Sequence, residues 1–311
     1  MTREKKDILA TLAYFNMFDY PLKKREIHSF LGHAADMNEF EQALNILVTE
    51  LVVFKIGEFY SISNNYKLAE KRRKGNEKAS LLLKKAARAA KLVAAFPFVR
   101  GVAVSGSLSK NFADDKADID FFIITAPNRL WIARTLLHIF KKFTFLLNKQ
   151  DMFCMNYFID EAEPCIQEKN IFTATEVVTI LPLCGNTVFD IFFAINNWTK
   201  AFLPNNYMRV ASGGAMRKWW LKSAIEKMFS NKLGEWLDNF LMRLTAKSWD
   251  KKTRNKKTNS KGMIMSMHTG KHFSKPNPVN FQRKLLQRYE NSLAEIFKQY
   301  EVSLKVSFPK L

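Results

Sequence analysis

Two aspartates that alternate with apolar residues, Asp118 and Asp120, have the type and spacing to hold a metal ion together. They begin an apolar run with the pattern of a β-strand. Side chains two positions apart in a strand point to the same side, so Ile119 and Phe121 should face the opposite one. Two neighbouring carboxylates are unfavourable unless a cation neutralises them. We therefore expect a divalent cation that prefers oxygen ligands, Mg²⁺ or Mn²⁺, at this position.

A Gly-Ser pair, Gly106 and Ser107, lies at the end of the preceding apolar run, and a polar loop separates it from the aspartates. Glycine lets the backbone approach a triphosphate closely, and the serine hydroxyl and neighbouring N–H groups can donate to phosphate oxygens. Ser109 and Lys110 add a second hydroxyl and a positive charge to the same loop. Together the two motifs predict a metal-dependent site for a nucleoside triphosphate.

These residues resemble the polymerase-β-like nucleotidyltransferase superfamily. Its pattern is an apolar residue, Gly, then Gly or Ser, a loop, and Asp-x-Asp between apolar residues, which Gly106, Ser107, Asp118 and Asp120 match in order and spacing. The resemblance covers residues 98–160, and the layout of the whole chain also looks like bacterial proteins that carry a nucleotidyltransferase domain. It implies transfer of a nucleoside monophosphate from a nucleoside triphosphate to an acceptor hydroxyl, with release of pyrophosphate.

The chain departs from the family pattern in two places. Small members often read Gly-Ser-x-Ala-Arg-Gly, where this chain has Lys110 and Asn111 as the last two residues. Lysine keeps the positive charge without the planar fork of arginine, and asparagine can still adopt a left-handed backbone. The family also places a third carboxylate on a later strand. Asn156 and Asp160 are the two candidates for that position here, and we favour Asp160, because an asparagine there would leave the site without a base.

Alternating strands and helices should position these residues, which indicates an α+β protein with a small mixed-sheet nucleotidyltransferase core. We expect strands over 99–104, 119–125 and 152–159, with a helix over 128–147. A long basic helix over 67–95 should lead into this core and end before Pro97. Leu81, Leu82, Ala86, Ala89 and Leu92 are expected to form its buried face. The core is thus predicted to span residues 67–170.

Residues 1–66 predict a winged-helix-like unit. Helices are expected over 7–15, 23–31 and 38–51, with Asn38 as N-cap of the third, followed by a hairpin around Gly57. The third helix is acidic and lacks a lysine or arginine that could approach a phosphate or a guanine. Docking or regulation is therefore the expected role of this unit, rather than specific reading of DNA.

The remaining region, residues 171–311, is expected to be mainly helical. A polar, basic linker is predicted over 250–261, and a last helix over 280–300. Between them lies a loop rich in hydrogen-bond donors. His268 and Lys271 in this loop are candidates to close over a bound phosphate.

The chain has 49 Lys and Arg against 29 Asp and Glu, a formal net charge of +20, which favours a polyanionic partner. The excess is concentrated in Lys67–Lys91 and Lys247–Arg288, either of which could serve as a nucleic-acid patch or simply as solvated surface. An alternative function follows, namely a non-catalytic nucleic-acid-binding or regulatory protein with a degenerate transferase core. A second alternative is a glycosyltransferase that uses Asp118 and Asp120 to hold Mn²⁺ on a nucleotide sugar.

The three cysteines, Cys154, Cys165 and Cys184, show no C-x-x-C spacing and lie among apolar residues, which indicates reduced thiols and a cytoplasmic location. The N-terminus lacks the basic-then-apolar order of a signal peptide. No apolar stretch is uninterrupted over the length of a bilayer, so no membrane partner is expected.

Overall fold

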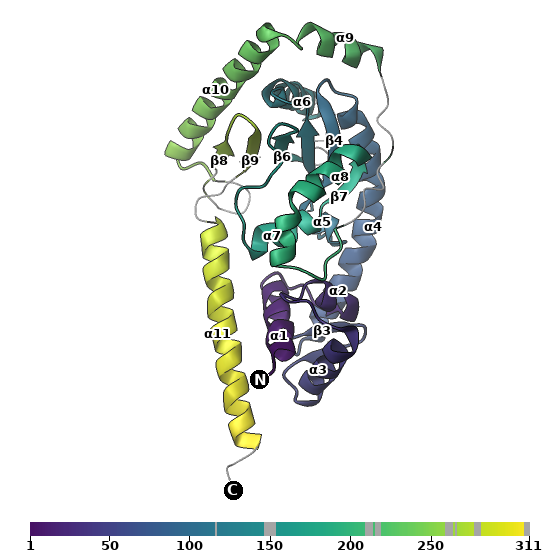
Figure 1. Cartoon of the computed structure of the whole chain (residues 1–311), viewed down its shortest axis with the longest axis vertical. Coiled ribbons are helices and arrows are strands. Elements are labelled where there is room, and N and C mark those ends of the chain that lie inside the picture. The colour runs from purple at the N-terminus through teal and green to yellow at the C-terminus, as the bar shows by residue number, and fades with distance from the viewer. Residues whose placement is uncertain are drawn as a thin grey trace.

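A computed structural model describes residues 1–115, 117–145, 154–208, 214, 219–258, 264, 266–276 and 281–307, without the side chains of 144, 145 and 301–307. The molecule is elongated and α+β. A small N-terminal unit lies at one end, a six-stranded sheet in the middle, and the helices α9 (Trp220–Met228) and α10 (Lys232–Arg254) at the other end (Figure 1).

The N-terminal unit combines three helices with a three-stranded antiparallel sheet. The helices are α1 (Arg3–Asn16), α2 (Lys24–Ser29) and α3 (Met37–Thr49); the strands are β1 (Leu22–Lys23), β2 (Phe54–Ile56) and β3 (Phe59–Ser61), in the order β1-β3-β2. The predicted helices and hairpin are confirmed. The predicted N-cap of α3 is wrong, because Asp36, not Asn38, accepts from the first backbone N–H groups, those of Asn38 at 2.8 Å and Glu39 at 3.4 Å.

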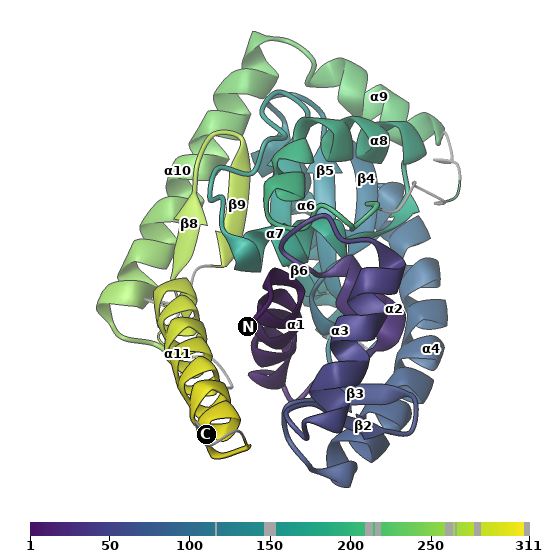
Figure 2. The ribbon, with the colours of Figure 1, turned by 60° about the horizontal axis from the view of Figure 1, so that its bottom comes forward.

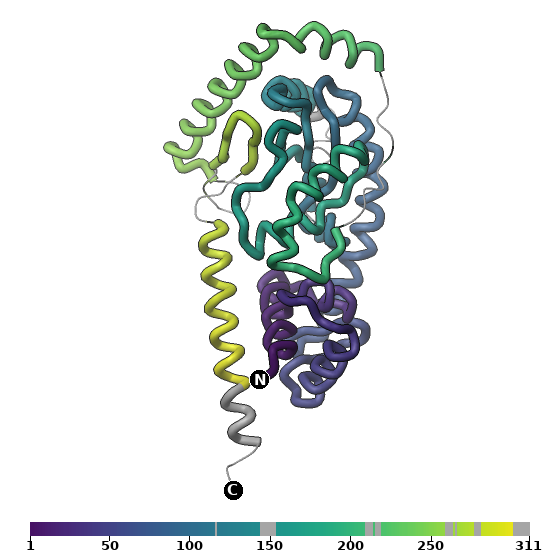
Figure 3. The backbone as a smooth tube through the Cα atoms, in the orientation of Figure 1, coloured from purple at the N-terminus to yellow at the C-terminus, as the bar shows by residue number. Residues whose placement is uncertain are grey.

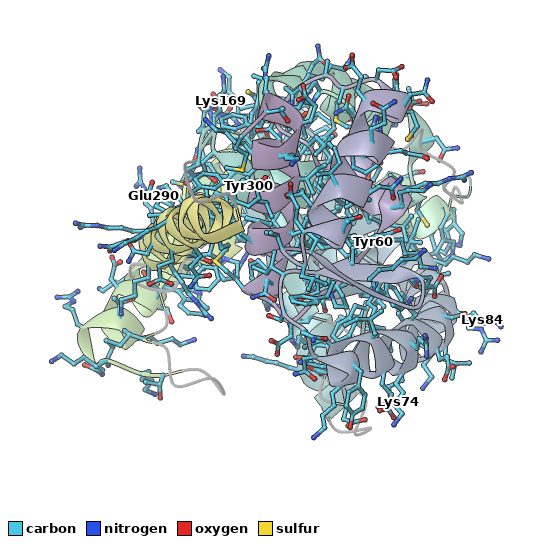
Figure 4. All side chains as sticks on the ribbon, turned by 90° about the horizontal axis from the view of Figure 1, so that it is seen from below. Tyr60, Lys74, Lys84, Lys169, Glu290 and Tyr300 are labelled. Carbon is cyan, nitrogen blue, oxygen red and sulfur yellow. The ribbon has the colours of Figure 1, made fainter. Side chains whose placement is uncertain are left out.

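The long helix α4 (Tyr66–Ala94) joins this unit to the central sheet. Its buried face consists mostly of alanines, which lets strand β4 (Val99–Val104) approach the helix closely. The predicted buried face is correct for Ala86 and Ala89 and wrong for Leu81 and Leu92, which are 63% and 54% exposed. Part of the basic run lies along the outer surface of the helix, where Lys74 and Lys84 project into solvent (Figure 4).

The central sheet has six strands in the order β7-β4-β5-β6-β9-β8. Besides β4, they are β5 (Asp120–Thr125), β6 (Cys154–Asp160), β7 (Leu181–Cys184), β8 (Met267–Thr269) and β9 (Phe273–Pro276). Among the strand pairs that the structure describes, β5 and β6 run in parallel and the others are antiparallel, so the sheet is mixed, as expected. Three of the strands follow residue 170, so the sheet extends across the boundary predicted there.

The two faces of the sheet pack against different helices. Ile119, Phe121 and Ile123 lie in one apolar cluster with α4 and α6 (Leu130–Phe145). Phe122 and Ile124 lie in another with α7 (Ile171–Val178) and α8 (Asn186–Ile195). This alternation confirms that Ile119 and Phe121 face away from the side on which Phe122 lies.

Beyond α8 the chain forms a short 3₁₀ helix (Asn197–Ala201), crosses the outer end of the molecule in α9 and α10, and returns through the β8–β9 hairpin (Figure 3). Residues 250–254 belong to α10, so the first part of the predicted linker is wrong; residues 259–263 lie outside the described part of the chain. The last helix, α11 (Phe281–Ser307), lies beside α1 (Figure 2). No helix among the described residues is long and apolar enough to cross a bilayer.

Arg72 links α4 to the N-terminal unit from within the expected basic patch. It is 1% exposed, and its guanidinium lies 3.6 Å from the centre of the Tyr20 ring. Its nitrogens reach Glu26 at 2.7 Å, the Pro21 carbonyl at 2.8 Å and Asn76 at 2.9 Å. This member of the basic run is therefore a structural residue and not part of a solvated patch.

Arg72→Met should lower the free energy of unfolding by about 2–4 kcal/mol, because it leaves Glu26 and a buried carbonyl without their partner. Denaturant unfolding measures this difference. Arg73→Met removes the same charge from an exposed neighbour and should change stability by less than about 0.5 kcal/mol. Equal effects of the two substitutions would contradict the structural role of Arg72.

Candidate functional site

The turn after β4 brings backbone against a carboxylate. Gly106 has φ +72°, a left-handed conformation that favours glycine, and starts the one-turn helix α5 (Gly106–Ser109). A Cβ atom on Gly106 would lie 3.1 Å from Oδ2 of Asp120. The Ser105 N–H donates to the Asp120 carbonyl at 2.9 Å, which fixes the turn to β5. A side chain at position 106 would therefore crowd the Asp120 carboxylate.

A bulge between β5 and β6 aims Asn156 at the same carboxylate. Phe121 pairs with Met155 and Phe122 with Tyr157, so Asn156 is the extra residue on β6. Its Nδ2 donates a short hydrogen bond to Oδ1 of Asp120. Its Oδ1 accepts from Sγ of Cys154 at 3.2 Å. Asn156 thus holds one oxygen of Asp120 in place.

Asp118 lies just before β5 and is exposed. Burial raises the pKa of the Cys154 thiol to about 12, and the negative charges of Asp120 and Asp118 add to that rise. Both carboxylates therefore lie near Cys154, the first residue of β6. Within the described residues no three His, Cys, Asp or Glu side chains cluster tightly enough to hold a metal on their own. Two carboxylates fit a Mg²⁺ ion that takes its other ligands from phosphates and water.

Asp160 does not join this group, which corrects the preference for it as third carboxylate. Asp160 pairs with Thr125 at one end of the β5–β6 ladder, whereas Asp120 pairs with Cys154 at the other. At about 3.3 Å per residue, Asp160 lies roughly 13 Å along β6 from Asn156. Asn156 is therefore the residue next to Asp120.

The buried Asp160 carboxylate instead ties loops to the end of β6. It accepts from the backbone N–H groups of Asn128 at 2.8 Å, Ala162 at 3.1 Å and Glu163 at 3.3 Å, and it contacts Nδ1 of His272 at 2.9 Å. These bonds occupy both of its oxygens. The structure gives Asp160 a role in holding the fold.

A cavity of about 410 Å³ opens beside Asp120 and Asn156. Its walls combine a polar end with an aromatic and aliphatic remainder. The lining residues are Ser105, Gly106, Asp120, Phe122, Asn156, Tyr157, Ile166, Phe172, Thr173, Glu176, Val177, Ile180, Lys275, Pro276, Phe281 and Gln282. Volume and lining suit a small organic ligand with one charged end.

Two lysines near this cavity are each paired with a glutamate. Lys275, 8% exposed and on β9, lies 2.5 Å from Glu168 and over the Tyr157 ring. Lys110 contacts Glu176 at 2.7 Å and the Gly106 carbonyl at 3.2 Å. Lys275 and Glu176 are not among the site residues predicted from the sequence. They are recognised as site residues only from the structure, because the elements that carry them line the cavity.

The predicted nucleotide-binding loop is divided between two cavities. Gly106 lines the first, whereas Ser109 and Lys110 line a second one of about 370 Å³ that also contacts Tyr20 and Arg25 of the N-terminal unit. The Ser109 hydroxyl donates to the Gly106 carbonyl at 2.9 Å and so serves the turn itself. Ser107 is exposed, and Asn111 has the expected left-handed backbone, with φ +60°.

The donor-rich loop forms the β8–β9 hairpin, and its two candidate residues lie outside the cavity lining. His268 is half exposed, 3.6 Å from Glu168, and its ring packs edge-on against Phe273. Lys271 lies 3.6 Å from Glu235 of α10. Of this hairpin, Lys275 and Pro276 are the residues that line the cavity.

Comparisons of the chain with models of protein families, with curated proteins and with solved structures found no match.

Proposed function

We propose that the chain is a metal-dependent nucleotidyltransferase that moves a nucleoside monophosphate from a nucleoside triphosphate to an acceptor hydroxyl and releases pyrophosphate. The observation that carries the proposal is the meeting of three features at one cavity: the left-handed Gly106, the Asp120 carboxylate and the Asn156 amide. Gly106 begins α5, Asp120 begins β5 and Asn156 lies on β6, and the Gly-Ser and Asp-x-Asp motifs predict that the first two lie close together.

In this proposal Asp118 and Asp120 hold Mg²⁺ or Mn²⁺ together with the phosphates. When bound, the cation neutralises the negative charge that gathers on the reacting phosphate. The backbone of Gly106 lets the triphosphate approach, because no side chain stands in the way. Asn156 keeps the Asp120 carboxylate oriented. The aromatic wall that includes Phe122 and Tyr157 accommodates the base or the acceptor.

Lys110 and Lys275 supply positive charge in the same proposal. Each is now paired with a glutamate, Glu176 or Glu168, and an incoming triphosphate would compete with these carboxylates. Catalysis then rests on positioning and charge neutralisation, because the position beside Asp120 carries an amide and not a carboxylate base.

Residues 1–66 are proposed to act as a winged-helix-like docking or regulatory module. Three helices and a small antiparallel sheet support that description. The second cavity places this unit directly against the loop that carries Lys110, and the Tyr20 hydroxyl donates to the Lys110 carbonyl. Regulation would thus have a direct route to the site.

A second candidate function, a non-catalytic nucleotide- or nucleic-acid-binding regulator, is favoured by one observation. Asn156 stands where a third acid is expected, so the core retains the means to bind and lacks a base.

Calorimetric titration with a non-hydrolysable nucleoside triphosphate, with and without Mg²⁺, tests the binding that both candidates share. Transfer of label from nucleotides radiolabelled at the α-phosphate to any acceptor in a cell extract then separates them. The transferase proposal expects Mg²⁺-dependent binding and a labelled acceptor. Binding without transfer would favour the regulator, and no binding of any nucleotide would refute the proposed site.

A further inference from the structure

Two helices at the outer end of the molecule present large apolar side chains to solvent. They are α9, with the residue that precedes it, and α10 (Figure 1). Trp220 is 71% exposed, and Trp236 is 61% exposed. We call this the tryptophan surface, formed by Trp219, Trp220, Met228, Leu233, Trp236 and Phe240, all of them exposed.

The orientation of α9 is fixed by polar contacts on its inner side. Lys222 donates to the carbonyls of Ala94 at 2.8 Å and Val99 at 2.7 Å. Glu226 accepts from the Phe98 N–H at 2.6 Å and pairs with Arg100 at 2.8 Å. Two charged side chains of α9 thus face inward, while its apolar residues Trp220, Leu221 and Met228 are exposed.

The outward face of α10 is an apolar stripe. Leu233, Trp236, Phe240 and Leu244 recur at helical spacing, and the rings of Trp236 and Phe240 stack with centroids 5.6 Å apart. The inward residues, which include Leu237 and Leu241, pack on the core beside α6. Helix α10 thus has two apolar faces, one that packs on the core and one that is exposed.

The exposed area of these rings reaches the size of the largest apolar patch on a typical monomer. A tryptophan side chain offers about 150–250 Å², so the exposed fractions of Trp219, Trp220 and Trp236 alone sum to roughly 350 Å². The largest apolar patch on a typical monomer, at about 300–600 Å², is often functional. We therefore expect a binding partner to cover this surface.

Charge indicates which occupant. Beyond the stripe, α10 carries Arg243, Lys247, Lys251, Lys252 and Arg254 against one acid, Asp250. A second copy of the chain would bring the same basic segment and the same net charge of +20. Nucleic acid would match the charge and leave Leu233, Met228 and Leu244 without a partner. An anionic lipid surface satisfies both, because tryptophan, leucine and phenylalanine enter the headgroup boundary while lysine and arginine meet the phosphates.

We propose that the tryptophan surface and the basic end of α10 dock the protein onto an anionic phospholipid bilayer. Docking on the surface needs no spanning helix, so it is compatible with the lack of one among the described residues. It departs from the sequence-based expectation of no membrane partner, which came from the absence of an apolar span. The proposal is independent of the transferase chemistry.

Co-sedimentation of the full chain with phosphatidylcholine vesicles, with and without phosphatidylglycerol, tests it. We expect binding to the anionic vesicles, a blue shift of tryptophan emission and much weaker binding to phosphatidylcholine alone. The double variant Trp220→Ser/Trp236→Ser should bind at least about tenfold more weakly, because it removes two large apolar contacts. Tyr66→Ser, which alters an aromatic residue 68% exposed on α4, is the matched control and should bind normally.

Two double charge-reversal variants distinguish attraction by the basic end of α10 from attraction by the net charge of the whole protein. Lys251→Glu/Lys252→Glu should weaken vesicle binding, whereas Lys84→Glu/Lys85→Glu, with the same change in net charge on α4, should leave it nearly unchanged. The proposal is overturned if the protein does not bind anionic vesicles. It is also overturned if the tryptophan variant binds as well as its Tyr66→Ser control, or if the two lysine variants bind equally well. Sedimentation velocity without lipid adds one more outcome: a dimer that the tryptophan variant abolishes would assign this surface to a second copy.

Discussion

Asp120→Asn should reduce Mg²⁺-dependent nucleotide transfer by about a thousandfold or more. The substitution removes one of the two charges that we propose hold the cation, while an amide oxygen can still accept the hydrogen bond from Asn156. Asp120 is only partly buried, so the variant should unfold at the wild-type temperature. Single-turnover release of pyrophosphate over a range of Mg²⁺ concentrations measures the loss, and Asp118→Asn should behave in the same way.

The matched control is Asp115→Asn, which removes the same charge from an exposed loop residue that pairs with Lys78. Its transfer rate should equal that of the wild type. If Asp120→Asn retained that rate as well, the Asp-x-Asp motif would not be the catalytic centre. If Asp120→Asn lost activity because it unfolded, the Asp118→Asn variant would decide the question, since its side chain is exposed and its substitution should not disturb the fold.

Asn156 and Asp160 should respond in opposite ways to substitution. Asn156→Asp places a carboxylate against Asp120, so it should lower the Mg²⁺ concentration needed for half-maximal activity and raise transfer about ten- to a hundredfold by supplying a base. Without metal the same variant should unfold at a lower temperature, because two carboxylates then face each other. Pyrophosphate release and thermal unfolding, each with and without Mg²⁺, measure both effects.

Asp160→Asn should cost about 2–4 kcal/mol of stability and leave the transfer rate of the folded protein unchanged. The buried carboxylate accepts three backbone N–H groups and contacts His272, and an amide cannot accept them all. Chemical unfolding and turnover below the melting transition are the two measurements. A normal stability with lost turnover would return Asp160 to the catalytic site.

The sequence predicts the local geometry of these residues where it depends on neighbours along the chain. Strand period places Asp120 on the face opposite Phe121, and the glycine before the loop marks the turn. The choice between Asn156 and Asp160 depends on the β5–β6 register and its bulge. That register results from packing across the sheet, and no local pattern in 152–160 encodes it.

Contacts between distant segments account for the other differences. Lys275 and Glu176 reach the cavity from β9 and α7, elements that sequence reasoning assigned to a separate region. Arg72 looks like a solvated charge in its basic run, yet the ring of Tyr20 covers it. Helical spacing locates α4 and correctly places Ala86 and Ala89 on its buried face, but it also places Leu81 there, and that side chain is exposed.

Helix α11 contacts both the candidate cavity and the N-terminal unit. Phe281 and Gln282 line the candidate cavity at its beginning. Further along, Tyr289 packs edge-on against Tyr14 and its hydroxyl donates to the Ala10 carbonyl, while the Tyr300 hydroxyl donates to Glu50. Because α11 leaves the ribosome after every other element that lines the cavity, a nascent chain has an open pocket and an uncovered α1. The candidate cavity therefore gains its last lining residues, Phe281 and Gln282, only when this helix has been synthesised.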